Sequence, residues 1–375
     1  TYEQVEQWGP AIVAATQART MPPWLVTDDG SCGEFAHSEW LADEELATLA
    51  EWVDDGMVEG GEATRTPVER DTLDGDVLAQ QTPEFTPVAV GGEYAEFDEY
   101  RCFMVDPELT EAKYLTGYEM LPGTPEIVHH VIGHTVDLSA KTWNGHRTNA
   151  EQIEALSTDG RDGWPCFNGA GNQVSYTSDA IAWAPGLGAL NFPDGLGVKI
   201  NPGEVIVYQV HYNLANEGSE GLSDSTEIEL ELADSVDKEL YVFYVDYLLG
   251  YGEELEGGQT SVEYTRSATL QDFGLPQGVK FDVWATTPHM HEYGRKLSAR
   301  AVHPDSSETC MVDVPNWDFN WQHTYFYEEP VRLAHDDAWE ITCTFDTTSR
   351  PEGVKAGWGT GNEMCLTVVY GTPAL

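Results

Sequence analysis

From about residue 93 onward, the sequence consists of short runs of β-branched and aromatic residues that end at glycine, proline, asparagine or aspartate. Residues 127–136, 205–212, 279–287 and 339–345 are clear examples. This spacing is typical of antiparallel strands in β-sandwiches. The 36 glycines and 20 prolines also suit a turn-rich β protein better than a helical bundle. Because about 280 residues of this pattern are too many for one sandwich, we predict a mainly β fold with two of them.

The residues before this region have a helical pattern. Apolar residues recur at helical spacing over residues 5–16, and the sequence Met21-Pro22-Pro23 must end that helix. A second helix is expected at residues 42–55, before Gly56. Threonine, proline, aspartate and glycine then dominate, which indicates a linker or an extended wrapping segment. The expected organisation is a helical segment, a linker, a first sandwich and a second sandwich, at residues 1–62, 63–92, 93–232 and 233–375.

Charge excludes several classes of partner. The chain has 65 acidic and 18 basic residues, for a formal net charge of −47. Such a surface repels phosphate, so nucleic acid and anionic membrane surfaces are poor partners. A solvated acidic shell, as in a protein adapted to salt, explains the charge better than a dedicated cation-binding role. No apolar run is long enough for a membrane span, and a start at Thr1 without a signal peptide suggests a processed or trimmed product.

The six cysteines are well separated in the sequence. None forms a CxxC motif, which excludes zinc ribbons, thioredoxin-type redox motifs and c-type haem attachment in this stretch. Six separated cysteines suggest up to three disulfides and an oxidising compartment. Their spacing alone does not choose among the possible pairings.

Three histidines stand in strand-like runs of the expected first sandwich. His129 and His130 are adjacent, and neighbouring residues on a flat strand point to opposite faces. Both could reach one ion only where the backbone is locally twisted. His211 lies in a separate run. Taken singly, each is more simply explained as a core histidine with hydrogen-bond partners. Three imidazoles on neighbouring strands, however, form a natural site for a borderline or soft divalent metal.

A second group of possible ligands lies in the expected second sandwich. His289 and His291 form a His-x-His motif, and residues at this spacing on a strand share one face, as a metal requires. Met364 alone would be interpreted as core packing. A thioether together with two imidazoles would make a soft site that holds Cu(I) well.

The order of these motifs resembles one protein family. A His-His pair, Gln-Val-His-Tyr, His-x-His and Glu-Met-Cys follow one another over residues 93–375, as in the copper type II, ascorbate-dependent monooxygenases. The resemblance implies two jelly-roll-like domains with one copper each. The first copper, which supplies an electron, would be held by His129, His130 and His211. The second copper, where dioxygen binds and a C–H bond is cut, would be held by His289, His291 and Met364. Tyr100 and Gln209 match positions beside the first copper's ligands.

The resemblance implies a hydroxylation that uses O2 and two electrons from an external one-electron donor such as ascorbate. The substrate would be a small molecule, and the protein would be secreted or periplasmic and bacterial. Three positions depart from the peptidylglycine-hydroxylating members, which have arginine, asparagine and tyrosine where this chain has Thr287, Leu366 and Val368. Residues 289–297 are nearer the dopamine-hydroxylating type, which does not identify an amine substrate. A copper-binding or electron-transfer protein without hydroxylase activity is the main alternative. An adhesive double sandwich with incidental histidines is a weaker one.

Two disulfides are implied by the same resemblance: Cys102–Cys166 and Cys343–Cys365. Cys32 and Cys310 remain, and their pairing, which the sequence leaves open, would link the N-terminal segment to the second sandwich. Residues 1–62 also resemble the tail of a c-type cytochrome module found before this monooxygenase in some bacterial proteins. Met21 could be an axial ligand in a longer chain, but without a CxxCH motif we expect no haem here and favour a structural helical cap.

Overall fold

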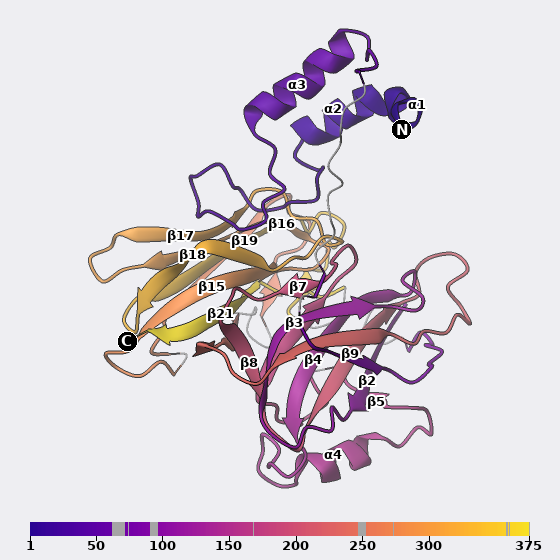
Figure 1. Cartoon of the computed structure of the whole chain (residues 1–375), viewed down its shortest axis with the longest axis vertical. Coiled ribbons are helices and arrows are strands. Elements are labelled where there is room, and N and C mark those ends of the chain that lie inside the picture. Colours follow the sequence, from indigo (N-terminus) through magenta and orange to yellow (C-terminus); the bar gives the residue numbers. More distant parts are fainter. Residues whose placement is uncertain are drawn as a thin grey trace.

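The computed structural model describes residues 1–61, 72–73, 75–90, 97–167, 169–246, 253–272, 274–357, 359 and 361–374. It is mainly β, with a few helices at the N-terminus, as the sequence predicts (Figure 1). Residues 63–71, 74, 91 and 92 of the expected linker lie outside the described residues. Within the remainder of that segment, residues 77–81 form a strand that joins the first half of the molecule.

The N-terminal helices lie at one end of the molecule, away from the sheets (Figure 1). They are α1 (Tyr2–Val5), the 3-10 helix η1 (Glu6–Trp8), α2 (Gly9–Gln17) and α3 (Asp43–Asp54). The first turn of α3 contains three acidic residues, Asp43, Glu44 and Glu45, which complement the helix dipole. The chain between α2 and α3 packs on the second half of the molecule: Phe35 is buried there and forms a β-bridge with Tyr327.

The first half contains two sheets. One has the strand order β5-β2-β9-β4-β6. The other has the order β1-β10-β3-β8-β11, with β7 beside β3. The elements are β1 (Val77–Gln81), β2 (Asp98–Val105), β3 (Lys113–Leu121), β4 (Val128–Asp137), α4 (Asn149–Leu156), β5 (Trp164–Pro165), β6 (Ser178–Trp183), β7 (Leu190–Asn191), β8 (Leu196–Ile200), β9 (Glu204–Asn213), β10 (Glu227–Ala233) and β11 (Lys238–Glu239).

The second half contains two four-stranded sheets, β12-β21-β15-β18 and β14-β19-β16-β17, and the short pair β13-β20. In the described part of the chain, every strand pairing is antiparallel except that of β11 with β8. The strands are β12 (Tyr241–Asp246), β13 (Glu254–Leu255), β14 (Val262–Thr269), β15 (Lys280–His289), β16 (Gly294–Val302), β17 (Glu308–Val314), β18 (Tyr325–Ala334), β19 (Ala338–Phe345), β20 (Val354–Lys355) and β21 (Leu366–Ala374).

Alternating buried positions on facing strands build the core of each half. Leu115 on β3 and Tyr208 on β9 are fully buried in the first half, as Leu297 on β16 and Ile341 on β19 are in the second. The first core also includes Ala285 and Tyr370 from β15 and β21. The two halves therefore pack together through apolar contacts.

All three disulfides are present, and both pairings implied by the resemblance are confirmed. The structure also pairs the two cysteines that the sequence left open, so residue 32 is tied to β17 in the second half. The bonds are Cys102–Cys166, Cys343–Cys365 and Cys32–Cys310. Among the described helices, none combines the length and apolar character that crossing a membrane requires.

Candidate metal centres

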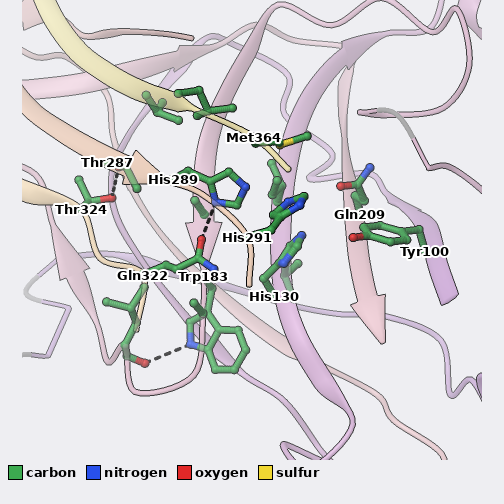
Figure 2. Close-up of a pocket in the computed structure, with 17 residues that line it drawn as sticks. Tyr100, His130, Trp183, Gln209, Thr287, His289, His291, Gln322, Thr324 and Met364 are labelled. Atoms are coloured by element: carbon green, nitrogen blue, oxygen red, sulfur yellow. Dashed lines mark hydrogen bonds between the residues drawn. The ribbon is translucent and has the colours of Figure 1, made fainter. Parts of the chain in front are cut away.

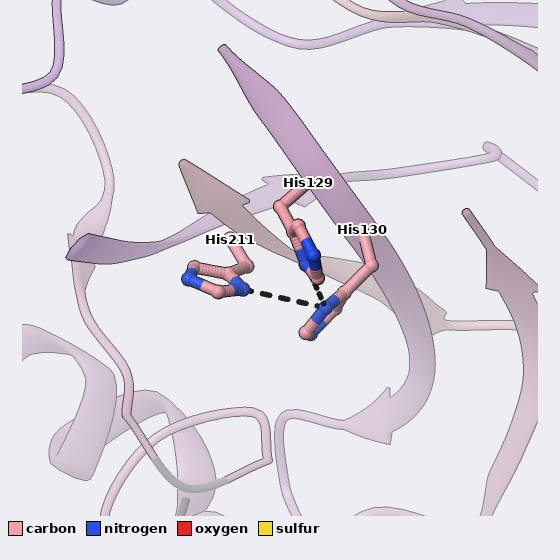
Figure 3. Close-up of side chains that lie close together, drawn as sticks. All are labelled: His129, His130 and His211. Atoms are coloured by element: carbon pink, nitrogen blue, oxygen red, sulfur yellow. Dashed lines mark hydrogen bonds between the residues drawn. The ribbon is translucent and has the colours of Figure 1, made fainter. Parts of the chain in front are cut away.

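The first group of histidines lies on two central strands of the five-stranded sheet. His130 on β4 is the register partner of His211 on β9. The register of this pair shifts between Val128 and His130, so His129 occupies an irregularity in the ladder. Such irregularities re-aim a side chain. This local distortion is what two adjacent histidines need in order to reach a common point, and Figure 3 shows their rings turned towards that of His211.

The three rings present nitrogen atoms to one another. Nδ1 of His130 lies 3.2 Å from Nδ1 of His129 and 3.3 Å from Nδ1 of His211. Burial lowers the pKa of His129 to about 4 and holds the pKa values of His130 and His211 well below the usual range. Each imidazole is therefore neutral near pH 7 and has one N–H group and one lone pair. Three ring nitrogens that point at one another are better suited to binding a common metal ion than to hydrogen bonding among themselves.

A buried carboxylate lies behind this cluster. An oxygen of Asp98 is 3.1 Å from Nε2 of His211, close enough to attract a proton there although the two are not aligned for a hydrogen bond. The negative charge favours the tautomer with the proton on Nε2, which leaves the Nδ1 lone pair directed at His130. A carboxylate behind a histidine is a common way to orient a metal ligand.

Tyr100 and Gln209, which the sequence associated with this cluster, lie beside it in different roles. The Tyr100 ring stacks on His211 with centroids 4.1 Å apart and planes 8° from parallel. Nε2 of Gln209 donates to the carbonyl oxygens of Cys166 and Gly169, both at 2.7 Å. Tyr100 thus fixes a candidate ligand directly, whereas Gln209 fastens the loop after Cys166 to β9.

The second group lies at the end of β15 and just before β21, strands that are paired in one sheet. His289, His291 and Met364 line the same cavity (Figure 2). Nδ1 of His289 is 2.5 Å from Oε1 of Gln322, and Nδ1 of His291 is 3.1 Å from the backbone oxygen of Asn362. Because both acceptors are oxygens, each Nδ1 carries the proton and each Nε2 keeps a lone pair. Burial lowers the pKa of His289 to about 4 and holds the pKa of His291 well below its usual range.

A fully buried carboxylate joins the two segments of this group. Glu363 accepts hydrogen bonds from the backbone N–H groups of His291, Tyr293 and Met364 at 3.0, 2.7 and 3.2 Å. Burial raises the pKa of Glu363 to about 8, while these backbone N–H groups act in the opposite direction. The next residue, Cys365, is anchored to β19 by its disulfide. The position of Met364 relative to the His-x-His motif is therefore fixed on both sides.

The sequence analysis did not identify Asp98, Gln322 and Glu363. Asp98 could have been found, since it stands two residues before Tyr100 and so shares its strand face. Glu363 adjoins Met364, and no feature of the sequence assigned it a role of its own. Gln322 lies in the loop between β17 and β18, and no local pattern in the sequence marks it.

A cavity of about 110 Å³ is lined by His130 from the first group and by all three members of the second group. His130, Tyr100 and Gln209 line it from the first half, opposite His289 and its neighbours from the second (Figure 2). Phe319, in the loop between β17 and β18, stacks on His129 at 4.6 Å and meets His291 edge-on at 6.0 Å. The sequence left the distance between the two groups open. The structure places His130 of the first group and the whole second group around one mostly apolar cavity.

The donor chemistry fits copper at both places. Imidazoles suit several transition metals, but a thioether beside two imidazoles favours the soft ion Cu(I). The histidine pKa values, lowered by burial, keep the nitrogens unprotonated and available for binding near pH 7. Fold and donors together describe a β protein with two candidate copper sites, one made of three imidazoles and one of two imidazoles and a thioether.

Comparison with known proteins agrees with this description. Residues 251–373 match the profile described as "copper type II ascorbate-dependent monooxygenase, C-terminal domain". Tyramine beta-hydroxylase of Caenorhabditis briggsae is 23% identical over 263 residues, which are 68% of this chain and 41% of that protein. Dopamine beta-hydroxylase of Rattus norvegicus is 23% identical over 283 residues, 70% of this chain and 44% of that protein. Residues 251–373 are thus similar to the C-terminal domain of the copper type II, ascorbate-dependent monooxygenases, and most of the chain is similar to hydroxylases of that kind.

Two further comparisons complete the findings. DBH-like monooxygenase protein 1 of Gallus gallus is 24% identical over 227 residues, 57% of this chain and 36% of that protein. The chain thus spans less than half the length of these curated relatives. Among solved structures, infectious bursal disease virus (Gx strain) is matched over 81% of this chain and 72% of that chain, at 10% identity and a TM-score of 0.21, a likeness too small to support an argument.

Proposed function

We propose that this chain is a monooxygenase that hydroxylates a C–H bond of a small organic molecule. The balanced reaction is R–H + O2 + two electrons + two protons giving R–OH + H2O. One observation carries the proposal: Met364, His289 and His291 line a cavity whose other walls are mostly apolar, so a soft metal site and room for an organic molecule coincide. Copper bound by these residues would supply one-electron redox chemistry and O2 binding.

The chain's own residues would prepare this site for the reaction. Gln322 and the Asn362 carbonyl hold the protons of His289 and His291 on Nδ1, so that both Nε2 atoms remain donors. Glu363 fixes Met364 to the same framework. The apolar wall excludes water, which protects reactive species from side reactions.

The first group would supply the second electron. His129, His130 and His211 would hold the other copper, with Asp98 and Tyr100 orienting His211. Phe319 contacts both His129 and His291, so the two groups that would hold copper are linked by one aromatic side chain. The electrons would come from an external one-electron donor such as ascorbate.

We also propose the finer organisation of the chain. Residues 93–232 and 233–375 would form two jelly-roll-like domains, with β11 still attached to the sheet of the first. Residues 1–62 would act as a structural cap on the second domain, supported by the Cys32–Cys310 bond and by buried Phe35. Three disulfides suit an oxidising compartment, so we propose a secreted or periplasmic protein.

A second candidate is a copper electron-transfer protein without hydroxylase activity. It is favoured by Thr287, Leu366 and Val368, which give the cavity wall no charged group to anchor a substrate. Consumption of O2 in the presence of a reductant and candidate amines, peptides and phenols separates the two functions. Uptake no greater than that of the metal-free protein would favour electron transfer.

The deciding experiment measures copper content after loading and dialysis. Wild type is compared with Met364→Ala and with Met104→Ala, a control at an exposed methionine on β2. We expect two copper ions per chain in wild type and in the control, and weakened Cu(I) binding at one site in Met364→Ala. One copper in wild type would favour electron transfer or storage, and none would refute the proposed function.

A further inference from the structure

We propose that the shared cavity selects an uncharged substrate: a mainly apolar molecule whose polar group is a single hydroxyl or carbonyl. This inference rests on the proposed function and names the substrate class of the same site. It concerns the part of the cavity beyond the candidate metal ligands. That part is formed by strands of both halves and by the loops that follow β6 and β17.

The wall of the cavity is apolar on both sides. Val131 and Trp183 contribute from the first half, Leu187 from the loop after β6, and Leu366 and Val368 from β21. Among the lining side chains that the structure describes, none is an aspartate, glutamate, lysine or arginine. An ammonium or carboxylate group on this wall would lose its hydration without gaining an ion partner. A neutral apolar body gains free energy from the same burial.

The amide nitrogens near the wall are already engaged within the protein. The Gln322 amide uses its oxygen for His289 and its nitrogen for the Phe319 carbonyl at 2.9 Å. The Gln209 amide nitrogen is bound to two carbonyls. The wall also has a pair of hydroxyls that bond to each other, because Oγ1 of Thr287 and Oγ1 of Thr324 are 2.8 Å apart (Figure 2).

This hydroxyl pair is suited to a neutral polar group. The buried Tyr370 hydroxyl interacts with both threonines, so three hydroxyls form one small network. Each hydroxyl donates once and accepts up to twice, and its proton rotates to suit the partner. Such a network can meet either a hydroxyl or a carbonyl. It carries no formal charge with which to hold an ion.

The test compares three ligands that each carry a phenyl ring on a two-carbon chain and differ in charge: 2-phenylethanol, phenethylammonium and phenylacetate. Dissociation constants are measured with the metal-free protein at pH 7 by NMR titration, so that no copper charge contributes. We expect 2-phenylethanol to bind at least about tenfold more tightly than either ion. Equal or tighter binding of phenethylammonium or phenylacetate, or no binding of any of the three, would overturn the proposal.

Substitution of the wall provides a second, independent arm. Leu187→Glu is expected to raise the affinity for phenethylammonium about tenfold, whereas the uncharged control Leu187→Gln leaves it unchanged. Thr287→Val should reduce the preference for 2-phenylethanol over ethylbenzene about tenfold, and Thr287→Ser should retain it. Unchanged selectivity in both Leu187→Glu and Thr287→Val would mean that the ligands bind elsewhere, which contradicts the proposal.

These measurements keep the inference separate from the proposed function. Ligand binding to the metal-free protein requires neither copper nor turnover. A wrong order of affinities therefore refutes the substrate class alone, while absence of copper or of hydroxylated product refutes the enzyme activity alone.

Discussion

The two candidate metal centres face one cavity, yet they are built from different parts of the fold. The first has three imidazoles, with His130 and His211 paired across β4 and β9. β9 is the central strand of its sheet, hydrogen-bonded to β2 on one side and β4 on the other. The second takes its donors from a strand end and from the segment before β21, which are joined by Glu363.

This difference in support indicates a difference in task. Donors on central strands that converge on one another hold a metal with little rearrangement, which suits electron supply. Donors that line a mostly apolar cavity, with one of them a thioether, would suit the proposed site for O2 and an organic substrate. The chain thus uses paired sheet strands for one centre, and a strand end with anchored loop segments for the other.

Removal of one ligand from each centre should have the largest effect. His211→Ala is expected to abolish copper binding at the first centre only, and His291→Ala at the second only. Because the proposed reaction needs both electrons, each variant should lose more than about 100-fold in hydroxylation rate. Copper content and product formation are measured together. Loss of both copper ions from either single substitution would contradict two independent centres.

Each centre has a disulfide beside it, and removing the two bonds separately should distinguish the centres. On the chain-entropy view, loss of Cys102–Cys166, with a separation of 64 residues, lowers the free energy of unfolding by about 4 kcal/mol. Loss of Cys343–Cys365, with a separation of 22, lowers it by about 3 kcal/mol. Urea unfolding of the paired Cys→Ser variants measures both values.

The same variants should differ in copper binding. Because Cys365 follows Met364 directly, the Cys343→Ser/Cys365→Ser variant should weaken Cu(I) at the second centre and spare the first. The Cys102→Ser/Cys166→Ser variant should weaken copper binding at the first centre and spare the second. The reason is that the Cys166 loop is bound through Gln209 to β9, the strand that carries His211. Equal weakening of both centres by one variant would argue against separate supports.

Asp98→Asn should produce a smaller effect that is confined to the first centre. Without the carboxylate charge, the proton of His211 is no longer held on Nε2, and the Nδ1 donor is lost for part of the time. We expect copper affinity at this centre to fall about 10- to 100-fold. Competition with a copper chelator measures the change, with Asp194→Asn at an exposed position as the control. An unchanged affinity would mean that Asp98 does not orient His211.

The smallest expected effect is a pH dependence near the second centre. His323 lies in the same loop as Gln322, and burial lowers its pKa from 6.5 to about 4. The folded protein holds His323 in its neutral form, whereas the unfolded chain takes up a proton there below about pH 6.5. The stabilising contribution of the neutral side chain is therefore complete above about pH 6.5 and is lost as pH falls towards 4. Between pH 7.5 and pH 5, wild type should lose about 2 kcal/mol more unfolding free energy than His323→Gln. The prediction is wrong if the unfolding free energies of wild type and His323→Gln, measured with urea, change in parallel with pH.

Local patterns predicted the parts of the fold that depend on local physics. Alternating β-branched runs became strands, because the pleat places successive side chains on opposite faces and so lets one face be buried. The strand expected to carry both His289 and His291 ends at His289, and His291 lies just beyond it, yet both side chains line the same cavity. The acidic start of α3 and the turn at Gly56 marked a helix within a few residues of its true bounds. The resemblance supplied two disulfide pairings, which periodicity could not have supplied.

Contacts between distant segments were not predictable in this way. Gln322 touches His289 across 33 residues, and Phe319 reaches His129 from the other half of the chain. Asp98 approaches His211 only because β2 pairs with β9 in one particular register. A one-residue slip would turn every side chain of the strand to the other face, and nothing local in either strand determines that register.

The sequence by itself therefore determined the mainly β character of the chain, its helical N-terminus and the two sets of possible ligands, because backbone geometry and donor chemistry act over a few residues. Only the tertiary structure decided that both sets face one apolar cavity and that Cys32 pairs with Cys310. Those outcomes depend on how the two cores pack against each other, because that packing is decided by the burial of many residues that are far apart in the chain.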